Sequence, residues 1–589
     1  MRPVLRFARW LLARLYLAFL WGVRSVTAPL RRRRKIYLHL MLDGGLPDFP
    51  PRLTWLSRFR DDRDISLYEA LDALKLARED AAVAGLVLSI RDLNAPWASL
   101  WELREALLAF KAAGKDVRAF ADGLDMGSFW LASAANHVTL VPQGGLQITG
   151  MRAEVLLLRS VLDRLGVKAE FLRAGKYKSY AEMFTETQMS PEAEEALGLI
   201  LDDRLDLWVE GVASARKLEP EAVRRLLDEG PFRAEDALAR GLIDRLAYGD
   251  EIQTALEEEV KQGGKTLVLM PMERYHRLKT RLINLRRPLT GVGHVVVLEV
   301  EGNIVEGEDR GLRRPTSVIS RESYQGLLRE LGEDDEVAGV VLRVDSPGGS
   351  ALVSDILWRE VKKLGEAKPV WVSMGSTAAS GGYYISAPAA RIYASPMAIT
   401  GSIGVIAGKF QGGNLLSRVG VSAGLVERGS RAGMYGVERG FSDDERAHLQ
   451  ADVDAMYAAF LSRVAEGRKM ETEAVHEVAQ GRIWSGAAAR ERGLVDRLGG
   501  MRDAIDGLVA EVGQAFRRVE VHPVPAPTNV GLPALLGMGL RGMIAAELRS
   551  LVGGAPHLLG DLDLARDTWG ALSAPGRRLL ALMPFQIRG

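Results

Sequence analysis

The sequence predicts an α/β protein made of two tandem copies of one unit, each with a parallel-type sheet covered by helices. The first observation is self-similarity: residues 83–88 (VAGLVL) recur at 337–342 (VAGVVL), 254 positions later, and residues 241–246 (GLIDRL) recur at 493–498 (GLVDRL), 252 positions later. The second is that short β-rich runs alternate with helical patterns, which is typical of parallel sheets with helical connections. The third is an apolar content of 47%, which supplies core for most of the 589 residues.

The two copies are expected over residues 36–250 and 293–515. In the second copy, apolar runs of strand length or helical spacing predict strands at 294–300, 337–344, 370–374 and 391–394 and a helix at 351–364. The offset changes by only two residues along the chain, which predicts that the first copy contains matching elements.

Residues 1–35 precede the first copy and are basic and aromatic, without an acidic residue. Four of the arginines fall within about 60° of one another at 100° per residue, which predicts an amphipathic helix lying in a membrane interface. The alternatives are a poor transmembrane anchor with snorkelling arginines, an uncleaved export signal and a soluble surface helix. The basic cluster at 31–35 favours membrane association, because it would bind anionic lipid.

Two further segments flank the second copy. Residues 251–292 are predicted as a linker, whose basic stretch forms either a solvated helix face or a membrane-facing surface. Residues 516–589 are predicted as a linker marked by Pro523, Pro525 and Pro527, followed by an amphipathic tail that packs on the body or on a membrane surface.

Composition excludes several classes of function. The 77 Lys+Arg residues balance 76 Asp+Glu residues, so a general nucleic-acid binder is not expected. The absence of cysteine rules out disulfides, thiol nucleophiles and cysteine-ligated metal sites. The eight histidines form no HExxH or HxH pair, so the sequence predicts no metal site, and it indicates no organic cofactor.

Two glycine-containing loops in the second copy follow predicted strands. The loop at 345–350 (DSPGGS) lets the backbone approach a ligand and frees N–H groups at a helix start, although a tight strand–helix turn would explain the same glycines. The loop at 378–384 (AASGGYY) places Ser380 at a strand-to-helix turn, next to unpaired amides. Such a serine is either an N-cap or a nucleophile. If it is a nucleophile, these amides would bind the oxyanion of the tetrahedral intermediate.

The first copy lacks both features. At an offset of 254, Ser380 faces Met126, and the two glycines of the first loop face Asn94 and Ala95. A feature needed only for the fold would be kept in both copies, so the loops indicate a site in the second copy. A nucleophilic serine needs a base, and no histidine lies near either loop in sequence; the base is then either a distant partner or a lysine kept neutral by burial.

Four motifs resemble the signal peptide peptidase A family in its long, internally duplicated form. RVDSPGGS at 343–350, SMGSTAASGGYYISAPA at 373–389 and TGSIGV at 400–405 lie in the second copy. GKYKSYAEMF at 175–184 lies in the first copy and is followed by Met-Ser-Pro. The resemblance covers about 36–510. It implies a serine peptidase with a Ser–Lys dyad and a ClpP/crotonase-like fold.

The family's site residues are carried over by motif. Ser380 matches the nucleophile and Lys178 matches the general base. Lys176 is the competing base, and we expect it to be solvated. Ser402 matches a serine that orients the lysine amine, unless it is a turn serine.

The repeat arithmetic adds an independent check on this dyad. Lys178 corresponds to Ala432 in the second copy, so the copy with the serine lacks the lysine and the copy with the lysine lacks the serine. A single site between the repeats, within one chain, is therefore expected. We expect the amides of Gly349 and Gly381 to bind the oxyanion.

The resemblance implies a membrane-associated endopeptidase that degrades cleaved signal peptides and other extended apolar peptides. It also implies a homotetramer at the bacterial inner membrane, with the catalytic body on the periplasmic side. Peptides and membrane lipid are therefore the expected partners, and nucleic acid is not. The alternatives are a crotonase-type acyl-CoA enzyme, which would not need Ser380 or Lys178, and a non-catalytic membrane scaffold, which would cleave nothing.

Overall fold

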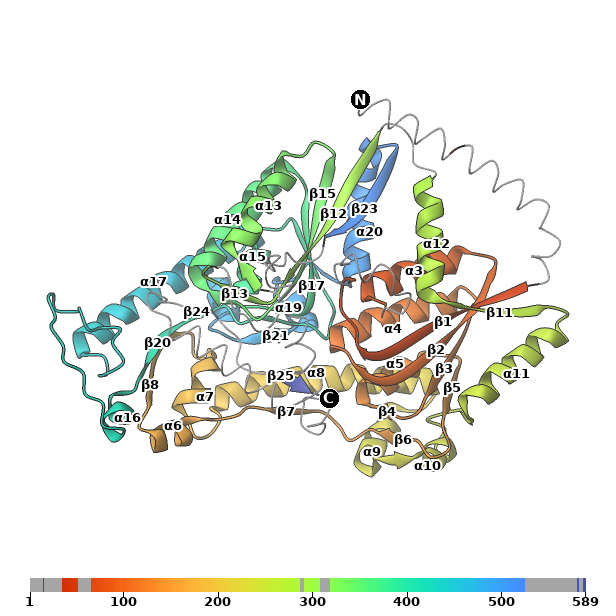
Figure 1. Cartoon of the computed structure of the whole chain (residues 1–589), viewed down its shortest axis with the longest axis horizontal. Helices are drawn as coiled ribbons and strands as arrows, with labels where there is room; N and C mark the ends of the chain where they lie inside the picture. The colour runs from red at the N-terminus through yellow and green to blue at the C-terminus, as the bar shows by residue number, and fades with distance from the viewer. Residues whose placement is uncertain are drawn as a thin grey trace.

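The structure is a computed structural model of the whole chain, and it describes residues 14, 34–50, 65–285, 291–307, 318–524, 580–581 and 586–588. The molecule is elongated, with the main sheet of the first repeat at the right in Figure 1, while residues 159–185 of the same repeat lie at the left end beside the second repeat. The helix α8 (Pro191–Arg216) runs along the lower side (Figure 1). The predicted anchor over residues 1–35 lies outside the described residues, apart from 14, 34 and 35. Among the helices of the described ranges, none is both long enough and apolar enough to cross a bilayer.

A six-stranded parallel sheet forms the core of the first repeat. Its strands are joined by helices that cross back over the sheet, which keeps neighbouring strands parallel. The strand order is β10 (Arg245–Leu246), β5 (His137–Leu140), β3 (Asp116–Ala121), β2 (Val83–Asn94), β1 (Arg34–Gly45) and β11 (Thr266–Pro271), and the helices include α3 (Leu67–Glu79), α4 (Trp97–Ala112) and α5 (Met126–Ala132).

The second repeat contains an equivalent sheet, whose pairings are parallel apart from the short β21 on β19. The strand order is β21 (Ile483–Ser485), β19 (Ile399–Gly401), β17 (Val370–Ala379), β15 (Val337–Ser346), β12 (Val292–Glu301) and β23 (Arg518–Val524), with β18 (Arg391–Ala394) beside β17 and the helices α13 (Arg321–Glu333), α14 (Ala351–Ala367) and α15 (Gly381–Ser386). The predicted α/β fold with two repeats is confirmed, and so are the four strands and the helix predicted in the second copy.

Strand pairing also aligns the two repeats residue by residue. The first strand pairs with the second through the same irregularity in both sheets, directly after Ile36 in β1 and directly after His294 in β12. The partners of these two residues, Val83 and Val337, are separated by the offset of 254 seen in the sequence. Ile36 and His294 therefore occupy equivalent positions.

The structure differs from the predicted linker at 251–292. This stretch contains α11 (Gly249–Gln262), β11 and α12 (Met272–Leu285); β11 is the edge strand of the first sheet, and α12 packs on α3. In the second repeat, α20 (Met501–Val512) and β23 correspond to α11 and β11. The predicted end of the second copy at residue 515 is therefore also corrected, because β23 extends the sheet to Val524. β11 and β23 are thus the edge strands of their sheets. The sequence does not predict α12 as a packed helix, because its many basic side chains are exposed and only a few of its residues are buried.

Pro523, predicted to begin a linker, instead lies inside β23. Edge strands tolerate proline, because one side of the strand needs no N–H donor. Pro525 and Pro527 lie outside the described residues, as does most of the tail that follows them.

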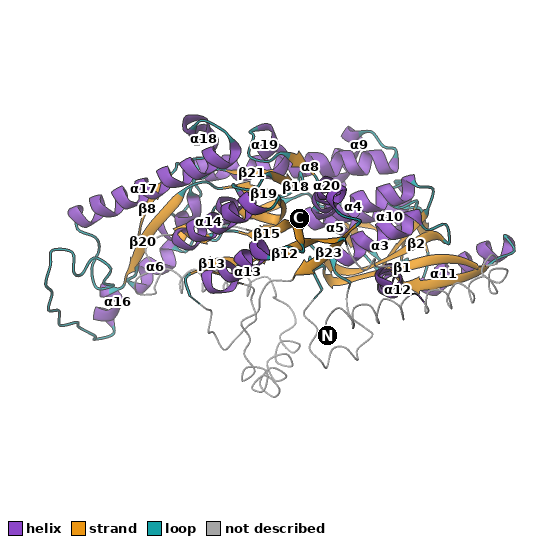
Figure 2. Cartoon of the chain, turned by 90° about the horizontal axis from the view of Figure 1, so that it is seen from above, coloured by secondary structure: helices purple, strands orange, loops and turns teal. Residues whose placement is uncertain are grey.

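The repeats interlock through a third sheet that takes strands from both. Its order is β14 (Val318–Ser320), β13 (Asn303–Val305), β16 (Gly349–Ser350), β24 (Leu580–Ala581), β20 (Val405–Gln411) and β8 (Lys168–Ala174). β8 of the first repeat pairs antiparallel with β20 of the second over seven residue pairs (Figure 2). This pairing brings the segment after β8 next to the segment before β20.

A buried ion cluster also joins the repeats. Arg343 on β15 lies 2.6 Å from a carboxylate oxygen of Asp48 and 2.7 Å from one of Glu102, both in the first repeat. The Arg343 side chain is 1% exposed, so its charge depends on these two partners. The relative position of the two repeats is thereby fixed by polar contacts as well as by apolar packing.

Candidate active site

Ser380 lies where β17 runs into α15, in a strained backbone conformation. Its φ of 55° and ψ of −116° are uncommon for a residue with a side chain. The conformation is held because the Ser380 amide donates to the Gly401 carbonyl at 2.8 Å and the Ser380 carbonyl accepts from the Tyr384 amide at 2.9 Å. The Ser380 hydroxyl occupies the N-cap position of α15 but makes no capping hydrogen bond to this helix. The side chain is therefore free to act elsewhere.

Lys178, from the first repeat, contacts this hydroxyl. Its Nζ lies 2.7 Å from Ser380 Oγ and donates to the carbonyl oxygen of Ser402 at 2.9 Å. Only 1% of Lys178 is exposed, and burial lowers the pKa of its amine to about 7. The arrangement can hold an uncharged amine against an alcohol, which is the chemistry required to activate a serine.

A loop of the second repeat fixes the lysine segment. The Tyr177 amide donates to the Gln480 carbonyl at 2.8 Å, and the Gly481 amide donates to the Ile403 carbonyl at 2.7 Å. Gly481 has a φ of +79°, and a Cβ there would lie 2.5–2.7 Å from backbone and Cβ atoms of Lys178. Only glycine fits this approach. No motif in the sequence links this loop to the lysine, so its role is not predicted.

Ser402 completes the surroundings of the amine. Its Oγ lies 3.1 Å from Lys178 Nζ, and its amide donates to the Arg482 carbonyl at 2.6 Å. The φ of Ser402 is 51°, so this residue too is held in a left-handed conformation. The structure thus places the side chains of Ser380, Lys178 and Ser402 next to one another.

Lys176, the competing base, points elsewhere. It is exposed, and its Nζ lies 4.9 Å from the centre of the Tyr177 ring. It makes no described hydrogen bond with Ser380.

The two predicted amides lie on loops that touch each other beside Ser380. A Cβ on Gly381 would lie 3.1 Å from Gly348 Cα, so the loop at 345–350 packs against the start of α15. Gly349 has a φ of +151°, and a Cβ there would lie 1.9 Å from the Ile304 carbonyl oxygen. Because the Ile304 amide donates to the Gly348 carbonyl in the parallel pairing of β13 and β16, the Gly349 amide points to the opposite edge of β16.

Asp345, at the start of the same loop, holds the end of β17. Its carboxylate accepts hydrogen bonds from the Ser376 amide at 2.9 Å and from the Thr377 amide at 3.1 Å. Burial raises the pKa of this carboxyl to about 7. Asp345 lies within a motif of the sequence, but the motif alone does not predict this positioning role.

The matching positions of the other repeat contain neither group. Met126 is a buried residue at the start of α5, and Ala432 is exposed. Ser380 and Lys178 therefore meet once in the chain, between the repeats.

A short strand lies between two edges next to this site. β24 pairs antiparallel with β16 (Gly349 with Ala581) and with β20 (Ile406 with Leu580). The edges of β16 and β20 thus face each other across the width of one extended chain. A segment of the protein's own backbone fills that width.

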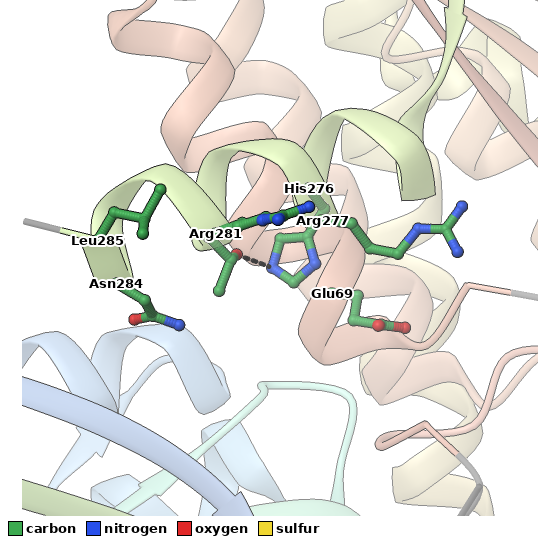
Figure 3. A pocket seen from close by; sticks show the side chains of 7 residues that line it. Glu69, His276, Arg277, Arg281, Asn284 and Leu285 are labelled. Atoms are coloured by element: carbon green, nitrogen blue, oxygen red, sulfur yellow. Dashed lines mark hydrogen bonds between the residues drawn. The ribbon is translucent and has the colours of Figure 1, made fainter. Parts of the chain in front are cut away.

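A cavity of about 510 Å³ lies elsewhere, between α12 and α3 (Figure 3). His276, Arg277 and Arg281 of α12 and Glu69 of α3 contribute to its lining. His276 Nε2 lies 3.0 Å from a carboxylate oxygen of Asp72 on α3, while Arg277 and Arg281 are exposed. The basic stretch is therefore the outer face of a packed helix, and none of the Ser–Lys groups lines this cavity.

Comparison with known proteins gives one matching family. The model described as "Peptidase family S49" matches residues 109–263 and 362–514. The chloroplastic serine protease SPPA of Arabidopsis thaliana is 32% identical over 479 residues, which cover 81% of this chain and 69% of the relative. Protease 4 of Haemophilus influenzae is 31% identical over 488 residues, which cover 80% of this chain and 78% of the relative. A solved structure of a ClpP1 mutant from Listeria monocytogenes aligns with 39% of this chain and 99% of its own, with 14% identity and a TM-score of 0.22.

Proposed function

We propose that the chain, which belongs to peptidase family S49 and is a serine peptidase, cuts peptide bonds with Ser380 as nucleophile and Lys178 as general base. One observation carries this proposal: a buried amine and a buried hydroxyl from different repeats lie 2.7 Å apart. The duplication of the fold explains neither group, because each is absent from the matching position of the other repeat.

The proposed reaction begins when Ser380 Oγ attacks the carbonyl carbon of the substrate. Neutral Lys178 accepts the hydroxyl proton and then delivers it to the leaving amine. Water attacks the acyl-enzyme in the second half, again with the lysine as base. Ser402 keeps the amine directed at Ser380, because both of its oxygens contact Nζ.

The amides of Gly349 and Gly381 are the proposed donors to the oxyanion. Each donor of this kind contributes roughly 3 kcal/mol to transition-state stabilisation in other acyl-transfer enzymes. Packing of the 345–350 loop against Gly381 supports the pairing of the two amides at one carbonyl oxygen. Asp345 acts as a positioning residue, since it holds the strand that leads to Ser380.

The lowered pKa of Lys178 decides whether the base is useful. An amine with a pKa of about 7 is half uncharged at pH 7. With the ordinary value of 10.5, only about one amine in 3,000 would be uncharged. Burial therefore raises the fraction of competent base about a thousandfold.

The substrate is proposed to bind as an extended strand between the edges of β16 and β20. Backbone hydrogen bonds to a strand edge give affinity that does not depend on sequence, which suits a degradative peptidase. The position of β24 supports this mode, because a strand of the chain itself pairs with both edges. Extended apolar peptides, such as cleaved signal peptides, are the proposed substrate class, in keeping with the family resemblance.

The resemblance and the basic first 35 residues support a location at the bacterial inner membrane, with the body on the periplasmic side and anionic lipid as a partner. A homotetramer is proposed on the same resemblance. Apolar side chains exposed in the loop at 419–437 support a contact with a second copy, and Val426 is 86% exposed. Light scattering of the detergent-solubilised full chain tests the tetramer, and a monomer at micromolar concentration would contradict it.

A fluorophosphonate probe and a casein-cleavage assay on the intact chain test the proposed dyad. We expect the parent to be labelled and to cleave casein, and Ser380→Ala to do neither. Lys178→Ala should lose cleavage, whereas the matched Lys176→Ala should keep it. A parent that is not labelled at Ser380 would support the acyl-CoA enzyme, and a folded parent that cleaves no casein would support the scaffold. Lost activity in Lys176→Ala alone would reassign the base.

A further inference from the structure

Three side chains of the types that ligate metals lie on one face at the edge of the second sheet. His294 is on β12, and Glu520 and His522 are on the edge strand β23 beside it (Figure 1). His294 is in register with Glu520, and Val296 is in register with His522. Because side chains two residues apart on a strand point to the same face, Glu520 and His522 both lie next to His294.

The three side chains are close enough to share one ion. His294 Nδ1 lies 2.8 Å from His522 Nε2, and His522 Nε2 lies 3.9 Å from Glu520 Oε2. One ligand atom from each residue fits within 4.8 Å of the other two. Zinc–ligand bonds of about 2.0–2.1 Å in a tetrahedron place ligand atoms about 3.3 Å apart. The two separations given above differ from this value by about half an ångström, and the three ligand atoms all lie within 4.8 Å of one another, so side-chain rotations would bring them to one ion.

Two further charged side chains lie close to this cluster. The other ring nitrogen of His294 lies 3.8 Å from a carboxylate oxygen of Glu336. Metal-binding histidines usually direct their second nitrogen at such a group, which fixes the ring and makes the ligating nitrogen more basic. Arg518 Nε lies 3.3 Å from Glu520 Oε1, so the second carboxylate oxygen is the one directed toward the histidines.

The first repeat shows that the fold does not require these polar groups. Ile36 matches His294, and the residues of β11 that match Glu520 and His522 are Val268 and Met270. Ala82 takes the place of Glu336 at the offset of 254. All four polar positions of the second repeat are thus apolar in an otherwise equivalent pair of strands. A role in folding alone would not explain this difference.

We propose that His294, Glu520 and His522 bind one divalent transition-metal ion of the class that prefers imidazole and carboxylate ligands, with zinc as the representative ion. Water would complete the coordination, since the His522 side chain is 48% exposed. The ion would fasten β23 to β12 at the end of the folded body. The sequence predicts no metal site because its ligands are separated by more than 200 residues and meet only through strand pairing.

The test uses the full chain, purified without a polyhistidine tag and stripped with a chelator that is then removed. Titration with Zn²⁺ by calorimetry should show one saturable site per chain. His294→Ala and His522→Ala should each weaken this affinity at least tenfold. The matched control His448→Ala removes a histidine on α17 (Asp443–Arg468), outside the cluster, and should leave the affinity unchanged.

Two readouts keep the result unambiguous. Co²⁺ bound to the parent should give a visible absorption band that is absent from the His294→Ala/His522→Ala double variant. Zn²⁺ should raise the melting temperature of the parent but not that of His522→Gln, which preserves the size of the side chain. The proposal is overturned if the parent shows no saturable Zn²⁺ binding up to a free concentration of about 100 μM, well above the range of built sites. It is also overturned if the double variant binds as tightly as the parent.

Discussion

Replacing Lys178 by methionine separates what the buried amine does for the chemistry from what it costs the fold. Methionine is similar in length, flexible and uncharged, so it can fill the same space. We expect peptide cleavage to fall by roughly 10²–10⁴-fold, the usual contribution of a general base. We also expect the variant to be more stable than the parent at neutral pH.

The size of the stability gain follows from two opposing contributions. The pKa of Lys178 falls from 10.5 to about 7 in the folded chain, and this difference corresponds to roughly 5 kcal/mol at 1.36 kcal/mol for each pH unit. Methionine removes that cost but loses the contacts of Nζ with Ser380 Oγ and with the two oxygens of Ser402. At about 1 kcal/mol each, these contacts offset roughly 3 kcal/mol. The expected net gain is about 2 kcal/mol at pH 7 and below.

The stability difference between Lys178→Met and the parent should depend on pH in a definite direction. Between about pH 7 and 10.5 the unfolded chain keeps the lysine proton and the folded chain does not, so the stability of the parent rises with pH. The advantage of Lys178→Met should therefore shrink above pH 7. It should change sign at roughly pH 8, where the remaining cost of the lysine equals the value of its contacts.

Urea unfolding of the parent, Lys178→Met and Lys176→Met between pH 6 and 9 measures this effect. Only the difference between variant and parent is compared, so groups that titrate in both chains cancel. The Lys176→Met control removes an exposed lysine and should change neither stability nor cleavage. A Lys178→Met variant that is less stable than the parent at pH 6, or a difference that stays constant with pH, would refute the buried, uncharged amine.

Three further outcomes are expected. The kcat/KM of the parent should rise through about pH 7 as Lys178 loses its proton, and a flat profile from about pH 5 to 9 would contradict the proposed base. Gly481→Ala should lower cleavage at least tenfold because its Cβ would meet Lys178. The control Gly420→Ala, at a glycine with a φ of +78° and nothing within 4 Å of a built Cβ, should keep full activity. Equal effects of the two substitutions would show that the close approach of Gly481 to Lys178 is unimportant. Deleting residues 580–589 removes β24 and should lower the KM for peptides without changing kcat, and an unchanged KM would separate β24 from the substrate groove.

The sequence predicts the repeats and the serine loop well because both have local signatures. The strand Val337–Ser346 is a continuous apolar run with a glycine-rich end, and its counterpart in the first copy repeats the same letters. Comparison of the two copies then indicates Ser380 as a site residue, because the copies share the fold but only the second has a hydroxyl at this position. Lys178 could be selected as the base only through the family motif. The sequence does not show which lysines are buried, and Lys176 lies only two residues away.

The parts of the fold and of the site that the sequence does not predict depend on contacts between distant segments, which leave no local pattern. Gly481 supports Lys178 across two repeats, and its function is visible only once the two segments lie together. The edge strand β11 was not predicted because its residues are half-exposed and α12 presents its arginines outward. His294 and His522 approach each other through the register of two strands, which pattern analysis of either strand alone cannot provide.

The antiparallel pairing of β8 with β20 has a genetic consequence. Both groups of the proposed dyad come from a single polypeptide, so each chain would carry its own complete centre and would not borrow a missing group from a neighbour. Two inactive alleles, one altered at Ser380 and the other at Lys178, should therefore fail to complement each other when they are expressed together. Enzymes whose centre is shared between subunits would regain part of their activity in the same cross.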